Sequence, residues 1–156
     1  TGEEQGLHGS QAYVNEYRDD LGDILGVFNT DMFGYDGDND RCFEIHVGRL
    51  EDSNQVGGCL ADIAEGYALD LKFDYLVSDT IGASDHSTFW NAGVGAIEVL
   101  ENFNTHGFQG GCSSADKNPN YHSEMDLIKT VNIDTGHSIA KAVIAAVASF
   151  AGIVED

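Results

Sequence analysis

Basic residues are scarce in this 156-residue chain, which has 7 Lys and Arg against 27 Asp and Glu and a formal net charge of −20. A surface with this excess of negative charge repels phosphate groups, so nucleic acid and anionic membrane surfaces are poor partners. The excess fits a protein that stays soluble in high salt, a secreted acidic enzyme, or an ordinary acidic protein.

Long hydrophobic runs are also lacking. No stretch approaches the roughly 20 apolar residues that a membrane-spanning helix needs, and the longest apolar segment, 139–153, is alanine-rich and amphipathic. The chain has neither an initiator Met nor a signal-like start, so we expect Thr1 to be a processed or truncated end.

Cysteine is limited to Cys42, Cys59 and Cys112, with no Cys-x-x-Cys spacing. This pattern argues against a zinc ribbon. One disulfide with a free thiol, and three buried thiols, are both open.

Hydrophobic residues make up 42% of the chain, including eight Phe, six Tyr and one Trp, as in a globular domain. Strand and helix patterns alternate along it, which predicts an α/β sandwich with a mostly parallel sheet of about four strands. We expect helices at 10–21, with Ser10 as N-cap, 53–68, 85–91 and 135–153, and strands at 24–32, 42–47, 71–77 and 94–100.

Two adjacent carboxylates, Glu3 and Glu4, have glycines on both sides at an expected turn before a helix. In a metallohydrolase one such carboxylate can bind a metal while its neighbour transfers a proton. Most isolated Glu-Glu pairs are solvated charge, but three further segments accompany this one. They are residues 29–35 (Asn-Thr-Asp-Met-Phe-Gly-Tyr), 84–90 (Ser-Asp-His-Ser-Thr-Phe-Trp) and 118–123 (Asn-Pro-Asn-Tyr-His-Ser).

Together these segments resemble the co-catalytic zinc aminopeptidase family, which includes bacterial leucyl aminopeptidases, aminopeptidase Y and, more distantly, glutaminyl cyclases. The resemblance implies a three-layer α/β/α sandwich of the zinc-dependent exopeptidase type, acting on the N-terminal residues of a peptide substrate. It also implies two zinc ions in the complete domain, with Glu3 as the general base. The zinc ligands that it implies in this chain are Glu4, Asp31 and His122, converging at the C-terminal edge of the sheet.

Three other residues occupy positions close to that site in the family's pattern. Asp126 follows His122 by four residues, where a carboxylate would fix the imidazole tautomer. Tyr121 would reach the substrate or pack against the site. Asp85 belongs to a segment that we interpret as structural and pocket-forming, because adjacent Ser84, Asp85 and His86 cannot point at one another as a Ser-His-Asp triad requires.

Asp36, Asp38 and Asp40 alternate like the start of an EF-hand, but Arg41 replaces the required glycine. We interpret the segment as a solvated turn, and a weak calcium site stays open. No role is assigned to the remaining histidines, which are His8, His46, His106 and His137.

The resemblance spans nearly the whole of 1–156, yet corresponds only to the C-terminal half of the family's catalytic domain. The family's upstream His-x-Asp segment and bridging Asp have no counterpart in this sequence. We therefore expect the N-terminal half, in the same polypeptide or a separate chain, as a partner, an inactive isolated chain, and an extracellular location. The alternative is a non-catalytic structural or assembly protein built from a peptidase-like fold.

Overall fold

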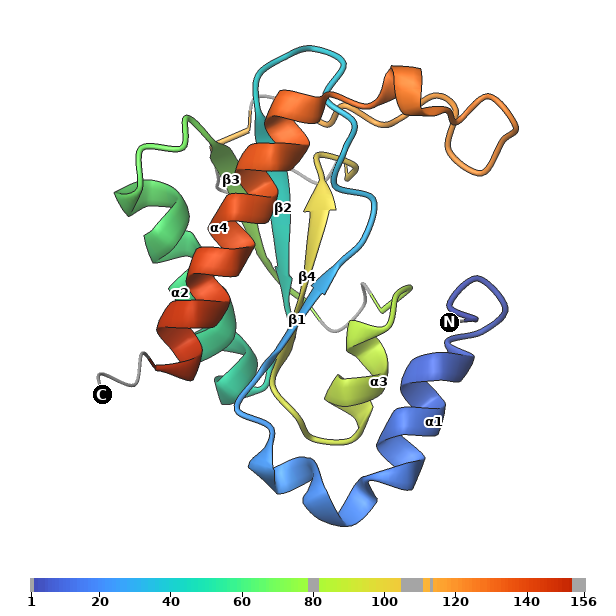
Figure 1. The fold of residues 1–156 in the computed structure, drawn as a ribbon, viewed down its shortest axis with the longest axis vertical. Coiled ribbons are helices and arrows are strands. Elements are labelled where there is room, and N and C mark those ends of the chain that lie inside the picture. The colour runs from blue at the N-terminus through green and yellow to red at the C-terminus, as the bar shows by residue number, and fades with distance from the viewer. Residues whose placement is uncertain (1, 79–81, 105–110, 113, 153–156) are drawn as a thin grey trace.

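A computed structural model describes residues 2–78, 82–104, 111–112 and 114–152 (Figure 1). A four-stranded sheet with the strand order β1-β4-β2-β3 forms its centre. The strands are β1 (Val27–Thr30), β2 (Cys42–Val47), β3 (Lys72–Val77) and β4 (Ala96–Glu101). The helices are α1 (His8–Glu16), α2 (Glu51–Gly66), α3 (His86–Asn91) and α4 (Ile133–Ala151), with 3₁₀ helices at Arg18–Asp23 and Ile128–Thr130.

The helices cover the sheet on two sides, α2 and α4 on one and α1 and α3 on the other (Figure 1). This is the expected three-layer α/β/α arrangement. The pairs β1–β4 and β2–β3 are parallel, whereas the central pair β2–β4 is antiparallel. The C-terminal ends of β1 and β4 therefore lie at one edge of the sheet, beside the N-terminal end of β2.

The apolar core lies between the sheet and the α2–α4 layer. Phe43, Ile45 and Val47 point to it from β2, and Ile97 and Val99 from β4, all fully buried. The alternate positions on the same strands point to the other face, and there the buried side chains include charged ones. The period-two pattern of a strand thus separates an apolar face from a partly ionic one.

The expected helix at 10–21 is wrong in its boundaries. The α-helix begins at His8 after Leu7, and Ser10 lies inside it, where its Oγ donates to Asp85 Oδ1 at 2.6 Å rather than capping the helix. The helix ends at Glu16, and a 3₁₀ helix follows from Arg18. Asp19, Asp20 and Gly22 have low α-helix propensity, which favours the tighter 3₁₀ helix over a continued α-helix.

Cys42 and Cys112 form a disulfide that joins positions 70 residues apart, and Cys59 is a free thiol. Of the two cysteine arrangements left open by the sequence, the structure has the first. Among the described residues, no helix has the length and apolar character that a membrane crossing requires.

Candidate metal centre

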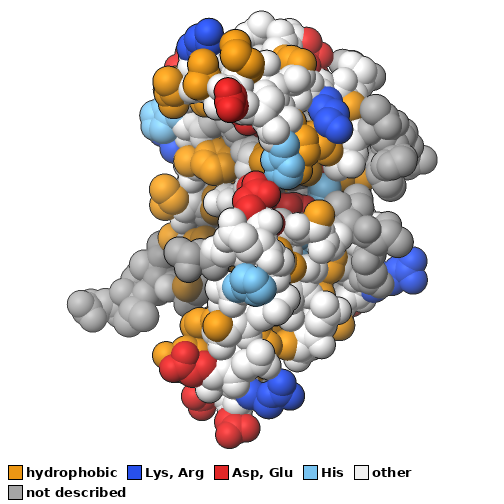
Figure 2. Space-filling model, turned by 90° about the vertical axis from the view of Figure 1, so that its right-hand side faces the viewer, with side chains coloured by type: hydrophobic (Ala, Val, Ile, Leu, Met, Phe, Trp, Pro, Cys, Tyr) orange, Lys and Arg blue, Asp and Glu red, His pale blue; other side chains and the backbone are white. Residues whose placement is uncertain are grey.

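An open pocket of about 570 Å³ lies at the C-terminal edge of β1 and β4. Segments from both ends of the chain enclose it, and in Figure 1 the N-terminal turn and the loop before α4 lie on the same side of the sheet. From that side, Figure 2 shows acidic and histidine side chains next to each other in the middle of the face. The sequence-predicted residues that line the pocket are Glu3, Glu4, Asp31, Tyr121, His122 and Asp126.

Glu4 and His122 come into contact although 118 residues separate them. His122 Nε2 lies 3.2 Å from Glu4 Oε1, and both side chains are more than half exposed to the pocket opening. The fold therefore brings a predicted carboxylate ligand and a predicted imidazole ligand to the same place.

The N-terminal turn is built from backbone hydrogen bonds and glycines. The amides of Gly6 and Leu7 both donate to the Glu3 carbonyl, at 2.9 Å each, before α1 begins. Gly2 and Gly6 have φ angles of 80° and 112°, which side chains other than glycine rarely adopt. The glycines that flank the Glu-Glu pair thus allow the tight turn that holds both carboxylates at the pocket.

Asp31 directly follows β1 and continues its pairing with β4, since its amide donates to the Val99 carbonyl at 3.1 Å. Its carboxylate accepts a 2.8 Å hydrogen bond from Ser84 Oγ, which itself accepts one from Asn29 Nδ2. Met32 then takes a φ of 49°, which turns the chain away from the strand. The segments 29–35 and 84–90 therefore meet around one carboxylate.

His122 lies in a compact loop, and its φ of 56° puts it in the left-handed region, an uncommon conformation that concentrates at functional sites. Its ring stacks on the ring of Tyr121, with centroids 3.9 Å apart. Asn118 organises the loop, because its Oδ1 accepts from the Asn120 amide and its Nδ2 donates to Asp126 Oδ1 at 3.0 Å. The role of Asp126 as a partner of His122 stays a prediction.

Negative charge gathers in the pocket and shifts two of its groups. Burial, followed by the nearby carboxylates of Asp31 and Glu4, raises the pKa of Glu3 above its ordinary value. Burial and the carboxylates of Glu4 and Asp31 likewise raise the pKa of Tyr121. Carboxylates that disfavour one another's ionisation form an environment that a divalent cation stabilises.

The donor set suits zinc, which binds imidazole nitrogen and carboxylate oxygen. Glu4 and His122 are in contact and Asp31 lines the same pocket, so these three residues could hold zinc, although their ligand atoms do not all lie within 4.8 Å of one another. Asp85 lies further back, where Ser10 holds its carboxylate and where it contributes to the raised pKa of Glu3.

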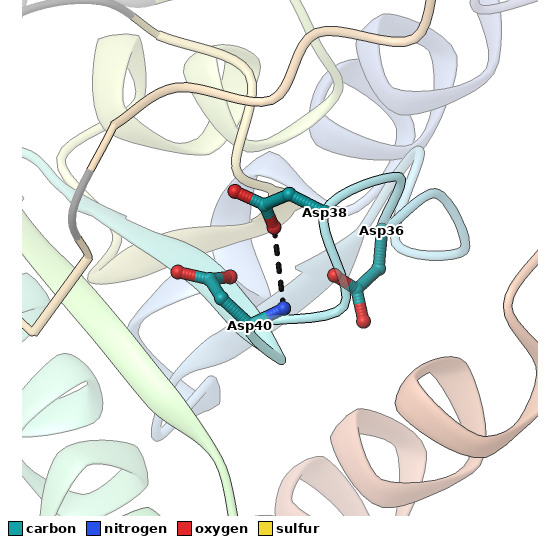
Figure 3. Close-up of side chains that lie close together, drawn as sticks. All are labelled: Asp36, Asp38 and Asp40. Carbon is teal, nitrogen blue, oxygen red and sulfur yellow. Dashed lines mark hydrogen bonds between the residues drawn. The ribbon is translucent and has the colours of Figure 1, made fainter.

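A second acidic group, Asp36, Asp38 and Asp40, lies after β1 (Figure 3). Its oxygens lie within 4.8 Å of one another, and among the described residues this is the only set of three potential ligands so closely spaced. Figure 3 shows a dashed bond from the Asp40 amide to Asp38, with the Asp36 carboxylate beside it. Asp36 accepts from Thr135 Oγ1 at 2.5 Å, so it anchors this loop to α4. The cluster has a structural explanation without an ion.

The sequence interpretation missed three charged residues on the second face of the sheet. Glu44 and His46 on β2 and Glu98 on β4 are buried, with exposed fractions of 1%, 0% and 5%. Glu98 also lines the pocket. A signal was present, because charged residues alternate with apolar ones in strands whose other face is the core. Their partners become visible only with the register of β2 against β4.

The comparisons with known proteins agree with this geometry. The model of a protein family described as peptidase family M28 matches residues 1–147. The chain belongs to peptidase family M28. Among curated proteins, none matches the chain.

Solved structures of aminopeptidases are similar to this chain over most of its length. The LapA aminopeptidase of Legionella pneumophila is 26% identical with a TM-score of 0.76, and the match covers 98% of this chain and 38% of LapA. BSAP, a zinc aminopeptidase from Bacillus subtilis, is 28% identical with a TM-score of 0.72, with 94% and 33% covered. The chain thus spans about a third of the length of these proteins.

Proposed function

We propose that the complete protein containing this chain is a zinc-dependent aminopeptidase that removes N-terminal residues from peptides, of the leucyl aminopeptidase and aminopeptidase Y type. Membership of peptidase family M28 and the likeness to LapA and BSAP support this proposal. The observation that carries it is the contact of Glu4 with His122 across a pocket that Glu3 and Asp31 also line.

In this proposal Glu4, Asp31 and His122 hold zinc, and the complete domain holds two ions. When bound, zinc would act as a Lewis acid on the scissile carbonyl. The other ionisable side chains that line the pocket are carboxylates and one phenol, none of which carries a positive charge that could neutralise a developing oxyanion.

Glu3 is the proposed general base. It would take a proton from the attacking water and return it to the leaving amine. Its raised pKa supports this role, because a carboxylate whose pKa lies nearer to the working pH is a stronger base towards the attacking water. Tyr121, Asp126 and Asp85 are proposed to surround the substrate and to hold the catalytic groups in place.

The proposal includes a partner and a location. Because the chain spans 38% of LapA, we propose that an N-terminal half of the domain, in the same polypeptide or in another chain, completes the site. The isolated chain 1–156 should then show no useful hydrolysis of aminoacyl substrates. The disulfide between Cys42 and Cys112 supports secretion, since structural disulfides persist in oxidising compartments.

The test uses the complete polypeptide with zinc and L-leucine p-nitroanilide as substrate. Glu3→Gln should lower kcat by about 10²–10⁴-fold, the range that general base catalysis contributes. The metal content, measured by elemental analysis, should stay unchanged. Glu16→Gln, the same change at an exposed position of α1, should keep kcat within twofold, and 1,10-phenanthroline should abolish turnover of the unmodified protein.

Normal turnover with Gln at position 3 would show that another residue is the base. A complete protein that binds no divalent metal would instead favour the alternative, a non-catalytic structural or assembly protein that keeps the peptidase fold.

A further inference from the structure

A buried ionic chain lies beneath the pocket on the second face of the sheet. His46 on β2 pairs directly with Glu98 on β4 in the antiparallel ladder. His46 Nε2 lies 2.6 Å from Glu44 Oε2, and His46 Nδ1 lies 3.0 Å from Glu98 Oε2, an ion pair whose angle falls outside hydrogen-bond geometry. One imidazole therefore stands between two buried carboxylates.

Contacts with both carboxylates favour the charged form of His46. A neutral imidazole would direct a nitrogen lone pair at one of the two carboxylates, whereas an imidazolium presents an N–H to both. Burial alone lowers the pKa of His46, but the close contacts and charges of Glu44 and Glu98 outweigh it and raise that pKa. One imidazolium balances only one of the two carboxylates, and a second buried imidazole, His86, has its Nδ1 3.8 Å from Glu98 Oε2, beyond hydrogen-bond distance.

Glu98 connects this charge to the pocket. Thr30 is opposite Val99 in the β1–β4 register, so Asp31 lies level with Leu100, and Glu98 lies two residues deeper along β4. At about 3.3 Å per residue, this places Glu98 about 7 Å below Leu100, which also lines the pocket. The ligand candidates therefore stand at the mouth of the pocket, and Glu98 stands at its floor.

The side chains that line the pocket between its mouth and its floor are either apolar or fixed by hydrogen bonds. Leu100 and Phe103 line the pocket beside Glu98. Asn104, another lining residue, donates from its amide and its Nδ2 to Glu44, at 2.6 Å each. Lys117 lies over the Phe103 ring, 4.3 Å from its centroid. Among the described residues that line the pocket, none is Lys or Arg.

We propose that Glu98 determines substrate specificity by accepting the cationic side chain of an N-terminal Lys or Arg, and that His46 and Glu44 are positioning residues that hold it. This inference rests on the proposed aminopeptidase function. The stem of the substrate side chain packs along Leu100 and Phe103, and its charged end meets Glu98 at the floor. The substrate cation then pairs with the Glu98 carboxylate, which lines the pocket.

The test compares kcat/KM for lysyl, arginyl and leucyl p-nitroanilides in the complete zinc-containing protein. The unmodified protein should prefer the two basic substrates. Glu98→Gln should lower the lysyl-to-leucyl ratio by about 10- to 100-fold, as expected for a lost charged hydrogen bond. His46→Gln should lower the same ratio to a smaller extent, a change that a loss of folded protein alone would not produce. Glu65→Gln, the same substitution on the exposed face of α2, should leave the ratio unchanged.

Two results would overturn the inference while the aminopeptidase function stands. One is an unmodified protein that prefers leucyl over lysyl substrate, which needs no variant. The other is an equal loss for both substrates in Glu98→Gln, which would assign Glu98 to the substrate's α-ammonium group or to folding.

If the complete protein hydrolyses no aminoacyl substrate, the proposed function fails, and binding decides the inference separately. Calorimetry with L-lysinamide and L-leucinamide should then show tighter binding of lysinamide, and Glu98→Gln should abolish the difference. Equal binding of the two amides to the unmodified protein would overturn the inference.

Discussion

At the scale of single residues, Glu101 shows how burial changes a carboxyl group. It ends β4 with 3% of its surface exposed, and its Oε2 accepts from the Tyr35 amide at 2.9 Å. Its Oε1 has no hydrogen-bond partner among the described residues. Burial, opposed by the Tyr35 amide and reinforced by Asp126 and Asp116, raises the pKa of Glu101 to about 7. The folded protein therefore favours the protonated carboxyl.

We expect the free energy of unfolding to fall as the pH rises from the unfolded-state pKa of 4.5 to about 7, because the folded protein must ionise a group that it holds neutral. The Glu101→Gln side chain cannot ionise. Across this pH range the free energy of unfolding of the variant should therefore rise by about 1–2 kcal/mol relative to the unmodified protein, with solvent screening included. Urea unfolding at pH 4.5, 6 and 7.5 measures this. Glu124→Gln, on the exposed loop, should show no such trend, and a constant difference for Glu101→Gln would contradict the expectation.

The residues that could be predicted from sequence are those whose motif is local. Glu3 and Glu4 with their glycines, Asp31 after a strand and His122 in a loop all reach one pocket. Their convergence around one metal and their individual roles stay predictions. Glu98 and His46 could not be found in the same way, because a charged residue in a strand has meaning only with its partner across the sheet. That partner depends on a register that no short motif encodes.

At the scale of elements, β2 and α3 match their expected ranges closely, and the other elements differ mainly at their ends. Val27–Thr30 is shorter than the expected strand because it pairs with β4 along only four residues. The antiparallel crossing of β4 beside β2 was not anticipated, since alternating strands and helices predict parallel neighbours. Burial patterns identify the elements, and pairing sets their limits.

Two neighbouring glycines of α2 should respond to alanine with opposite signs. A Cβ at Gly57 would lie 2.5 Å from Val47 Cγ2 and 2.8 Å from Tyr75 Oη, whereas a Cβ at Gly58 meets nothing within 4 Å. Gly57→Ala should lower the free energy of unfolding by about 1–3 kcal/mol through overpacking. Gly58→Ala should raise it by about 0.5–1 kcal/mol through helix propensity. Chemical denaturation of both variants checks this, and equal effects would mean that α2 does not pack on the sheet as described.

At the scale of the whole molecule, the Cys42–Cys112 disulfide closes a loop that contains β2, α2, β3, α3 and β4. A cross-link over 70 residues restricts the unfolded chain strongly. Cys42→Ala combined with Cys112→Ala should therefore lower the free energy of unfolding by about 2–4 kcal/mol. In the Cys59→Ser variant, dithiothreitol should lower the free energy of unfolding as much as it does in the unmodified protein. If dithiothreitol destabilises the double variant as much as the unmodified protein, the reductant does not act through this bond, which would contradict the expectation.

Under the proposed function, the disulfide has a consequence for when the protein becomes active. Glu44 binds Asn104 through hydrogen bonds, and Cys42 binds Cys112 through the disulfide. Two positions on one face of β2 therefore hold the chain that follows β4, which lines the pocket at Phe103 and Asn104. While the thiols are reduced, one of these two attachments is missing, and we expect a higher KM with unchanged metal content. Under the proposed function, the protein would then be latent while its thiols are reduced and would mature on oxidation.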